Sequence, residues 1–177
     1  RTPMGARLLR AWLTRPLRRI AAVNARLDAV GMLMKNRPLL NGLRERLATV
    51  RDLERLIARI DAGRGNARDL QALGTSLLPV PGLREQAEGA GDELIAAVAT
   101  ALHPLPELVD LIGRAVAETP PISIKDGGLI REGYCAELDE LRRLAGEGHA
   151  WLARYQAQEQ ERTGIKMEMA GGAFTAT

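Results

Sequence analysis

The sequence predicts a mainly helical, all-α fold: an irregular multi-helix bundle with one small β-hairpin and one long projecting helix. Apolar residues recur at steps of three and four through most of the chain, which is the spacing of one helix face. Asn, Asp or Thr stands directly before several of these stretches, where α-helices take their N-caps. Only residues 122–130 combine branched apolar residues with a tight-turn sequence. At 177 residues, the chain is long enough for one domain with a sizeable core.

The first 35 residues predict two helices. The first begins at Thr2-Pro3, because a hydroxyl N-cap followed by proline at the first helical position is a strong start signal. Arg15-Pro16 ends it. The second helix runs to about Met34 and has Arg19 at its start, where an acidic residue would contribute roughly 0.3–1 kcal/mol. The helical spacing of Trp12 predicts a core position for it. The apolar stripes of the two helices are Met4, Leu8, Ala11 and Trp12, then Ile20, Val23, Leu27, Val30 and Met34.

Three further helices follow. Residues 36–50 predict the third. Asp52 can cap the fourth, which Gly63-Arg64-Gly65 stops. Asn66, with Asp69 three residues later, predicts a capping box at the start of the fifth, and Pro79 and Pro81 should break that helix. The apolar stripes are Leu40, Leu43 and Leu47 on the third, Leu53, Leu56, Ile57 and Ile60 on the fourth, and Leu70, Leu73 and Leu77 on the fifth.

Residues 83–121 predict a short helix, a linker and two more helices. The short helix covers 83–88, and Gly89-Ala90-Gly91 is the most flexible linker that the composition suggests. Helices over 92–102 and 105–118 are hinged at His103-Pro104. The prolines of Thr119-Pro120-Pro121 then end the helical run.

The segment from residue 122 to residue 166 predicts a hairpin and then a long helix. Ile122, Ile124, Leu129 and Ile130 flank Asp126-Gly127-Gly128, which supplies the positive φ angles of a tight turn. The helix has a coiled-coil-like seam, whereas residues 156–162 are polar on every face, so the helix should project beyond its own core. The seam consists of Leu138, Leu141, Ala145, Gly148, Leu152 and Tyr155.

Two weaknesses are predicted in this long helix. Cys135 stands at its N-cap position, where cysteine costs about 1 kcal/mol relative to Asp, Asn or Ser. Gly146 and Gly148 lie inside the helix and cost about 1 kcal/mol each relative to alanine, so we expect a bend or a short break there.

Several segments together resemble the core, or lever, domain of the MutS family of DNA mismatch repair ATPases, with greater similarity to the bacterial proteins. They are TPMGARLLRAWLTRPL (2–17), RLDAV (26–30), DLERLIARI (52–60), KDGGLIREGYCAELDEL (125–141) and ERTGIK (161–166). The resemblance implies a MutS-like core/lever domain over residues 1–166, before the clamp. Residues 167–177 diverge from the family and are expected to be disordered. Truncation, a shifted reading frame and true divergence all remain open as reasons.

The resemblance also implies a function. The long helix would be the first of two levers that carry the DNA clamp, so the domain would link DNA grip to nucleotide state. The partners would be the clamp, connector and ATPase domains, and mismatched duplex DNA bound through the parent protein. That parent is expected to be a cytoplasmic homodimer using ATP and Mg²⁺. Because the first residue is Arg, we expect the chain to be part of a longer protein.

The charge distribution leaves an alternative open. The net charge is +3, but residues 1–68 carry +11 and residues 69–177 carry −8. A basic half attracts nucleic acid or an acidic partner, although solvated faces paired with acidic neighbours explain it more simply. The alternative function is therefore a free-standing helical adaptor or nonspecific nucleic-acid-binding module. The basic run, for which an interface with other domains is favoured over DNA contact, is Arg1, Arg7, Arg10, Arg15, Arg18, Arg19 and Arg26.

No catalytic, cofactor or metal site is predicted in this chain, and its DNA-contacting residues are unknown. Glu137, Asp139 and Glu140 suit a helix start better than acid–base chemistry. Lys125-Asp126-Gly127-Gly128 and Gly63-Arg64-Gly65 lack the pattern of a phosphate-binding loop. His103 and His149 have no recognisable nucleophile nearby in the sequence, and Cys135 is the only cysteine.

No apolar run approaches the roughly 20 residues of a membrane span, and no signal peptide is visible. We therefore expect no enzymatic activity, no cofactor and no membrane association.

Overall fold

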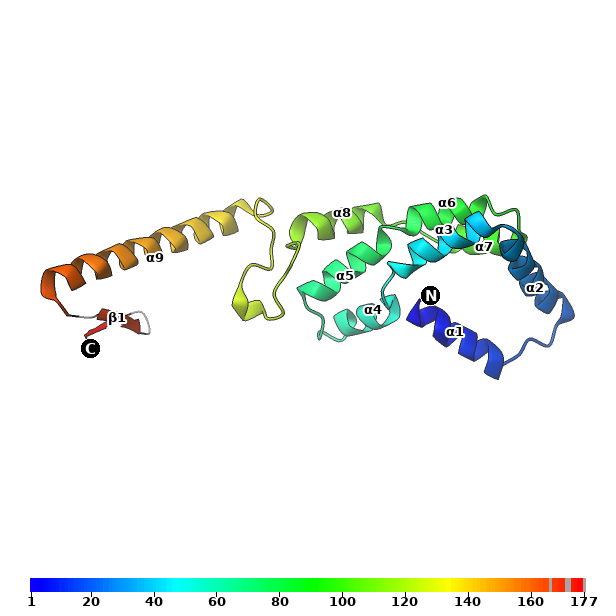
Figure 1. The fold of residues 1–177 in the computed structure, drawn as a ribbon, viewed down its shortest axis with the longest axis horizontal. Helices are drawn as coiled ribbons and strands as arrows, with labels where there is room; N and C mark the ends of the chain where they lie inside the picture. The colour runs from blue at the N-terminus through cyan, green and yellow to red at the C-terminus, as the bar shows by residue number, and fades with distance from the viewer. Residues whose placement is uncertain (166, 171–172, 177) are drawn as a thin grey trace. The chain divides into compact units, whose positions relative to one another are not determined.

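The computed structural model describes residues 1–165, 167–170 and 173–176, and the chain forms two compact units (Figure 1). The N-terminal unit is residues 1–131 and the C-terminal unit is residues 132–177. The all-α fold class is confirmed. The elements of the N-terminal unit are α1 (Pro3–Thr14), α2 (Ile20–Lys35), α3 (Arg37–Ala48), α4 (Leu53–Asp61), α5 (Ala67–Leu77), α6 (Val80–Glu88), α7 (Glu93–Ala101), α8 (Pro106–Ala115) and the 3₁₀ helix η1 (Ile124–Asp126).

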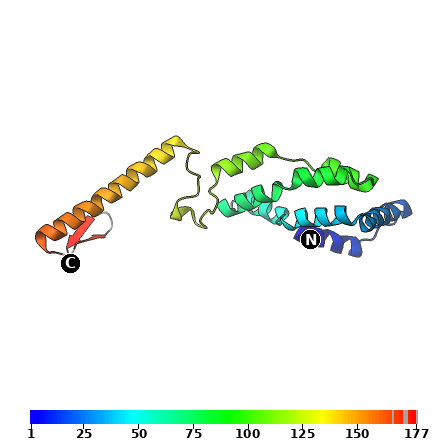
Figure 2. The ribbon, with the colours of Figure 1, turned by 45° about the horizontal axis from the view of Figure 1, so that its top comes forward.

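The N-terminal unit packs as two connected groups of helices. Helix α5 lies against α4 and α8, while α6 lies against α3 and α7, and α2 contacts α3 and α7 (Figures 1 and 2). Gly74 makes the α5–α8 contact possible, since a Cβ there would lie only 2.9 Å from Cγ2 of Ile112. The core is built mainly from small and branched residues: Ala29, Val50, Leu56, Val80, Leu83, Ala87, Ala90, Ala99, Ile112 and Val116.

The predicted helix starts are confirmed by their hydrogen bonds. Thr2 Oγ1 accepts from the Gly5 N–H at 3.0 Å and Asn36 Oδ1 from the Leu39 N–H at 3.2 Å. Asn66 forms the complete capping box with Asp69. These caps link residues three apart, so the local sequence is sufficient to specify them.

Two breaks expected between α5 and α7 are less pronounced than the sequence predicts. Pro81 lies in the first turn of α6, where the missing N–H has no helical partner to lose. That helix therefore begins at Val80 rather than at residue 83. The linker Gly89-Ala90-Gly91 is a tight turn with Ala90 buried and φ of Gly91 at 73°. It joins two helices that pack together.

The β-hairpin predicted around Asp126-Gly127-Gly128 is wrong. Ile124 lies in η1, which Ser123 caps, although Gly127 and Gly128 do take positive φ. The later half of the segment pairs with the chain after α8 instead: Ile130 forms an antiparallel bridge with Val116. The neighbouring hydrogen bonds are Ala117 N–H to Leu129 O at 3.0 Å and Arg131 N–H to Ala115 O at 2.9 Å.

The reason for the different pairing is tertiary. Val116 is buried, so pairing with it covers Ile130 with apolar surface, whereas Ile122 and Ile124 remain exposed. The residues before them, Pro120 and Pro121, have no N–H to donate to a strand ladder. The turn residues fixed the local backbone, but burial decided which strand pairs with which.

Helix α1 is held by a polar contact. The Arg7 guanidinium spans the Asp52 carboxylate, with Nη1–Oδ2 at 2.8 Å and Nη2–Oδ1 at 2.7 Å, and its Nε donates to Glu54 at 3.1 Å. Asp52 is also the N-cap of α4. The hydrogen bonds from Arg7 lower the pKa of Asp52 to about 2. No residue of α1 is buried, so this ion pair is the main link between α1 and α4.

In the residues that the structure describes, the C-terminal unit contains one long helix and two short strands. Helix α9 (Ala136–Thr163) runs 28 residues and ends at Gly164 in the left-handed conformation. It is continuous through Gly146 and Gly148, so the predicted break is absent. Cys135 is its N-cap and makes no side-chain capping bond, as predicted. Instead, Asp139 accepts a hydrogen bond from the Gly133 N–H at 2.8 Å.

The last residues differ from the sequence-based expectation. Disorder is predicted for 167–177, whereas β1 (Met167–Ala170) and β2 (Ala173–Ala176) form an antiparallel pair, with Met167 opposite Ala176. Residues 166, 171–172 and 177 lie outside the described residues. The domain boundary at residue 166 remains a prediction.

The Arg7–Asp52 ion pair predicts a pH dependence of stability. A carboxyl group whose pKa falls from 3.8 to about 2 on folding stabilises the fold above its unfolded pKa and loses that effect as pH falls through the folded pKa. We expect the thermal midpoint of the chain to drop between pH 4 and about pH 2, and Asp52→Asn to flatten this drop. The control is Asp28→Asn, which removes an exposed carboxylate without an ion pair among the described residues. Equal pH profiles for both variants would contradict the assignment.

The empty cap at Cys135 predicts a stabilising substitution. Cys135→Asp should raise the free energy of unfolding by about 1 kcal/mol, because a carboxylate at the N-cap can accept from the unpaired N–H groups of the first turn. Urea unfolding followed by circular dichroism measures the change. Cys135→Ala, which supplies no acceptor, is the matched control. A gain equal in both variants would show that removal of the thiol, rather than capping, is responsible.

Candidate interaction surfaces and an arginine-lined hollow

The residues weighed for chemistry are placed far apart or in structural roles. His103 is exposed between α7 and α8, and His149 lies on α9 with Nδ1 2.7 Å from the Ala145 carbonyl oxygen. Gly63 takes φ of 65° just after α4 and helps to end that helix. Within the described residues, no three His, Cys, Asp or Glu side chains gather as metal ligands would. Over the same residues, no single helix is long and apolar enough to cross a membrane.

The acidic cluster at the start of α9 forms local ion pairs. Asp139 contacts Arg142 at 3.3 Å, and Glu140 contacts Arg143 at 2.7 Å. The hydrogen bonds from Arg143 lower the pKa of Glu140. Arg143 also reaches Glu147, one turn further on. Asp139 and Glu140 are thus paired within the helix. The favourable interaction of the three acids with the helix start stays a prediction.

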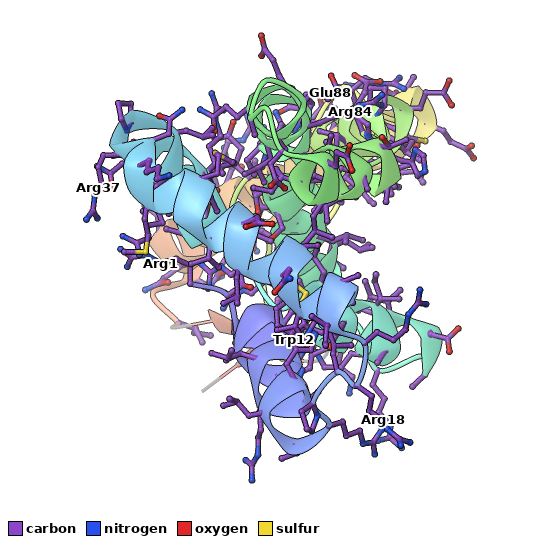
Figure 3. The ribbon with its side chains drawn as sticks, turned by 90° about the vertical axis from the view of Figure 1, so that its right-hand side faces the viewer. Arg1, Trp12, Arg18, Arg37, Arg84 and Glu88 are labelled. Carbon is purple, nitrogen blue, oxygen red and sulfur yellow. The ribbon has the colours of Figure 1, made fainter. Side chains whose placement is uncertain are left out.

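Two members of the basic run are used inside the N-terminal unit. Arg7 binds Asp52 and Glu54, and the Arg26 guanidinium carbon lies 3.5 Å from the centre of the Trp12 ring. Trp12 thus contributes a cation–π contact between α1 and α2, where Figure 3 shows it between the two helices. The other members are exposed: Arg1, Arg10, Arg15, Arg18 and Arg19.

The predicted apolar stripes of α1 and α2 face solvent within this chain. Ile20 is 77% exposed, Leu27 63% and Leu8 53%, and only Ala29 is buried in either helix. The helical periodicity is confirmed, but the core position that its spacing predicted for Trp12 is wrong, because that side chain is 39% exposed. Contiguous exposed apolar residues mark surfaces that bind another protein segment. We call these side chains the α1–α2 apolar face: Leu8, Leu9, Trp12, Leu13, Leu17, Ile20, Val23, Leu27, Val30 and Met34.

Helix α9 carries a second exposed apolar face. No residue of α9 is buried. Trp151 and Tyr155 stack with ring centres 5.4 Å apart and planes inclined by 9°. Of the predicted seam, Leu141 and Tyr155 are exposed while Leu138 and Leu152 are half-buried. The predicted seam left out Leu144 and Trp151. Both are exposed, like Leu141, and they lie at alternating steps of three and four residues from it.

A hollow lined by arginines was not predicted. It has a volume of about 1020 Å³ and opens between α1, α4 and α5. Its acidic residues are Asp52 and Asp69, of which Asp69 is buried and paired with Arg59. A signal existed in the four-residue step from Arg55 to Arg59, which places two cations on one side of α4 shortly after Arg51. The arginines of the hollow are Arg7, Arg51, Arg55, Arg59, Arg64 and Arg68.

Comparison with known proteins explains the resemblance. The family model of MutS domain III matches residues 1–167. The chain is 45% identical over 170 residues to the DNA mismatch repair protein MutS of Methanosarcina mazei, covering 94% of this chain and 19% of that protein. It is 46% identical to the MutS proteins of Symbiobacterium thermophilum, over 93% of this chain and 19% of the relative, and of Geobacillus thermodenitrificans, over 93% and 18%. The chain therefore spans about a fifth of the length of these relatives. On this similarity the chain belongs to the MutS family, in the region of domain III.

Proposed function

We propose that this chain serves as the helical core and first lever of a MutS-type DNA mismatch repair protein, linking the clamp that holds DNA to the ATPase domain. The observation that carries the proposal is α9, an uninterrupted helix of 28 residues without a buried side chain. At 1.5 Å per residue it extends about 42 Å. A helix of that length can connect distant domains.

Local ion pairs support the rigidity that a lever needs. Arg143 bridges Glu140 and Glu147, and Arg162 binds Glu159 at 2.6 Å. Pairs at three- and four-residue spacing stabilise isolated helices by about 0.2–0.5 kcal/mol each. Transmission between sites requires stiff elements with discrete arrangements, and these pairs give α9 stiffness independent of a packed core.

The exposed apolar faces support contact with other domains. Both the α1–α2 apolar face and that of α9 expose large apolar side chains, which contact with another domain would bury. In the proposed role they are covered by the clamp, connector and ATPase domains of a homodimeric, cytoplasmic parent protein. ATP and Mg²⁺ would bind in the ATPase domain, and mismatched DNA would be held by the parent.

The lever role can be tested in a chimera. Residues 1–165 of this chain replace the aligned segment of Geobacillus thermodenitrificans MutS, and ATP turnover is measured with paired and mismatched duplexes. Ala150→Pro, at an exposed position in the middle of α9, removes a helix hydrogen bond at a cost of about 3 kcal/mol. We expect it to preserve basal turnover and to abolish the difference between the two duplexes.

The matched control is Ala150→Gln, which keeps helix propensity at the same position. It should behave like the unsubstituted chimera. Retention of the mismatch-dependent difference in Ala150→Pro would contradict transmission through α9. A folded, unsubstituted chimera that shows no such difference would argue against the proposed function as a whole.

The chain alone is expected to hydrolyse no ATP. Its glycine segments form turns and a 3₁₀ helix rather than a strand–loop–helix phosphate cradle. Phosphate release from ATP and Mg²⁺ by purified chain, compared with a buffer blank and with an active MutS relative, measures this. Saturable turnover that copurifies with the chain through successive columns would overturn the expectation.

A further inference from the structure

We infer that the arginine-lined hollow binds phosphate groups, either of a nucleic acid backbone or of a small polyphosphate. This site is distinct from the apolar faces, and the inference does not depend on the lever role proposed above. It rests on the charge, the concave shape and the hydrogen-bonding state of the hollow between α1, α4 and α5.

The charge of the hollow is strongly positive. Six arginines line it against two acids, Asp52 and Asp69. Asp52 binds Arg7 and lies 3.6 Å from Arg55, while Asp69 binds Arg59. Arg51, Arg64 and Arg68 form no ion pair in the part of the chain that the structure describes. Three guanidinium groups in one hollow are therefore left without a neutralising carboxylate.

Two of the three arginines without an ion pair, Arg51 and Arg68, are held by different hydrogen bonds. The Arg51 N–H donates to the buried Ser76 hydroxyl at 3.0 Å, which fixes the backbone and leaves the guanidinium available. Arg68 uses Nε to donate to the Pro120 carbonyl at 2.8 Å, so its terminal nitrogens remain for a ligand. Arg51 and Arg68 also line the adjoining hollow of about 390 Å³ together with Glu118, a carboxylate whose ion pair at 3.7 Å is with Arg131. These two cations thus border both hollows.

The two acidic residues of the hollow, Asp52 and Asp69, hold arginine side chains in place. Asp52 holds Arg7 in a two-point contact, and the buried Asp69 is itself fixed by the Asn66 N–H at 3.2 Å. Guanidinium groups held in this way lose little conformational freedom when they bind, which favours binding. The fork of donors on each arginine matches the oxygens of phosphate.

The concave shape favours a phosphate group over an acidic protein face. A phosphate projects from its backbone and carries several oxygens, so one group can reach more than one arginine inside a hollow. Asp and Glu carboxylates on a flat protein surface reach fewer arginines inside such a hollow. An acidic peptide is accordingly the competing ligand class that the experiment must exclude.

The test compares two double variants of the chain. Arg51→Gln/Arg64→Gln removes two cations that make no side-chain ion pair in the described residues. Arg10→Gln/Arg15→Gln removes two exposed cations of the basic run outside the hollow. Both change the net charge equally. Circular dichroism and thermal melting establish that each remains folded.

Fluorescence anisotropy with a labelled duplex, paired or mismatched, is titrated at several salt concentrations. Isothermal titration calorimetry measures the binding of tripolyphosphate and of oligoglutamate to the same variants. We expect salt-sensitive duplex binding without mismatch preference, weakened about tenfold in Arg51→Gln/Arg64→Gln and little changed in the control. The slope of log affinity against log salt should become shallower by about 0.9 for each phosphate that the variant no longer neutralises.

The outcomes separate the possible ligands. Binding of duplex but not tripolyphosphate assigns the site to a nucleic acid backbone, and the reverse assigns it to a small polyphosphate. Equal losses in both double variants would show diffuse attraction to the basic half and overturn the site. Absence of phosphate binding at low salt, or tighter binding of oligoglutamate, would overturn it as well.

Discussion

Ser76 lies fully buried in α5, where its hydroxyl accepts from the Arg51 N–H and donates to the Ala72 carbonyl at 2.6 Å. A buried hydroxyl without partners would be costly, so both bonds fix the path of the chain beside α5. The same helix is closed against α8 by Gly74. Its first turn carries the buried Asp69, which holds both Asn66 and Arg59. Helix α5 is thus the element around which α4, α8 and the segment at residue 120 are arranged.

This arrangement explains how the hollow acquires its charge. The hydrogen bonds of α5 bring the chain at Arg51 and the side chains of Arg59 and Arg68 to one place, although they come from three successive segments. The simple interpretation of the basic half, pairing with acidic neighbours, holds for several arginines. Arg7, Arg55 and Arg59 each contact a carboxylate. In the acidic half, Arg84 likewise pairs with Glu88, and Figure 3 shows the two side chains together on α6. It does not account for Arg51, Arg64 and Arg68.

Local features could be predicted from the sequence, and long-range ones could not. The capping bonds of Thr2, Asn36 and Asn66 join residues only three apart. The three- and four-residue spacing of apolar side chains in α1, α2 and α9 likewise involves near neighbours in the sequence. The pairing of Ile130 with Val116 depends on which neighbour is buried, a property of the folded unit. The hollow needs Arg7 and Arg68 together, 61 positions apart. Helical periodicity identifies an apolar face without indicating whether the chain itself or another segment covers it.

Helix α1 joins the two kinds of surface that the chain presents. On one side Arg7 anchors it to Asp52 and Glu54 at the wall of the hollow. On the other, Leu8, Leu9 and Leu13 are exposed. With no residue buried, α1 depends for its position in this chain on the modest ion pairs of Arg7 and on the cation–π contact between Trp12 and Arg26. A segment that packs on these leucines would also hold α1 in place, and with it the Arg7 side chain at the wall of the hollow. Ligands that each favour the same position of one element reinforce one another reciprocally. In the roles proposed above, apolar contact by another domain and anion binding in the hollow would therefore favour the same placement of α1.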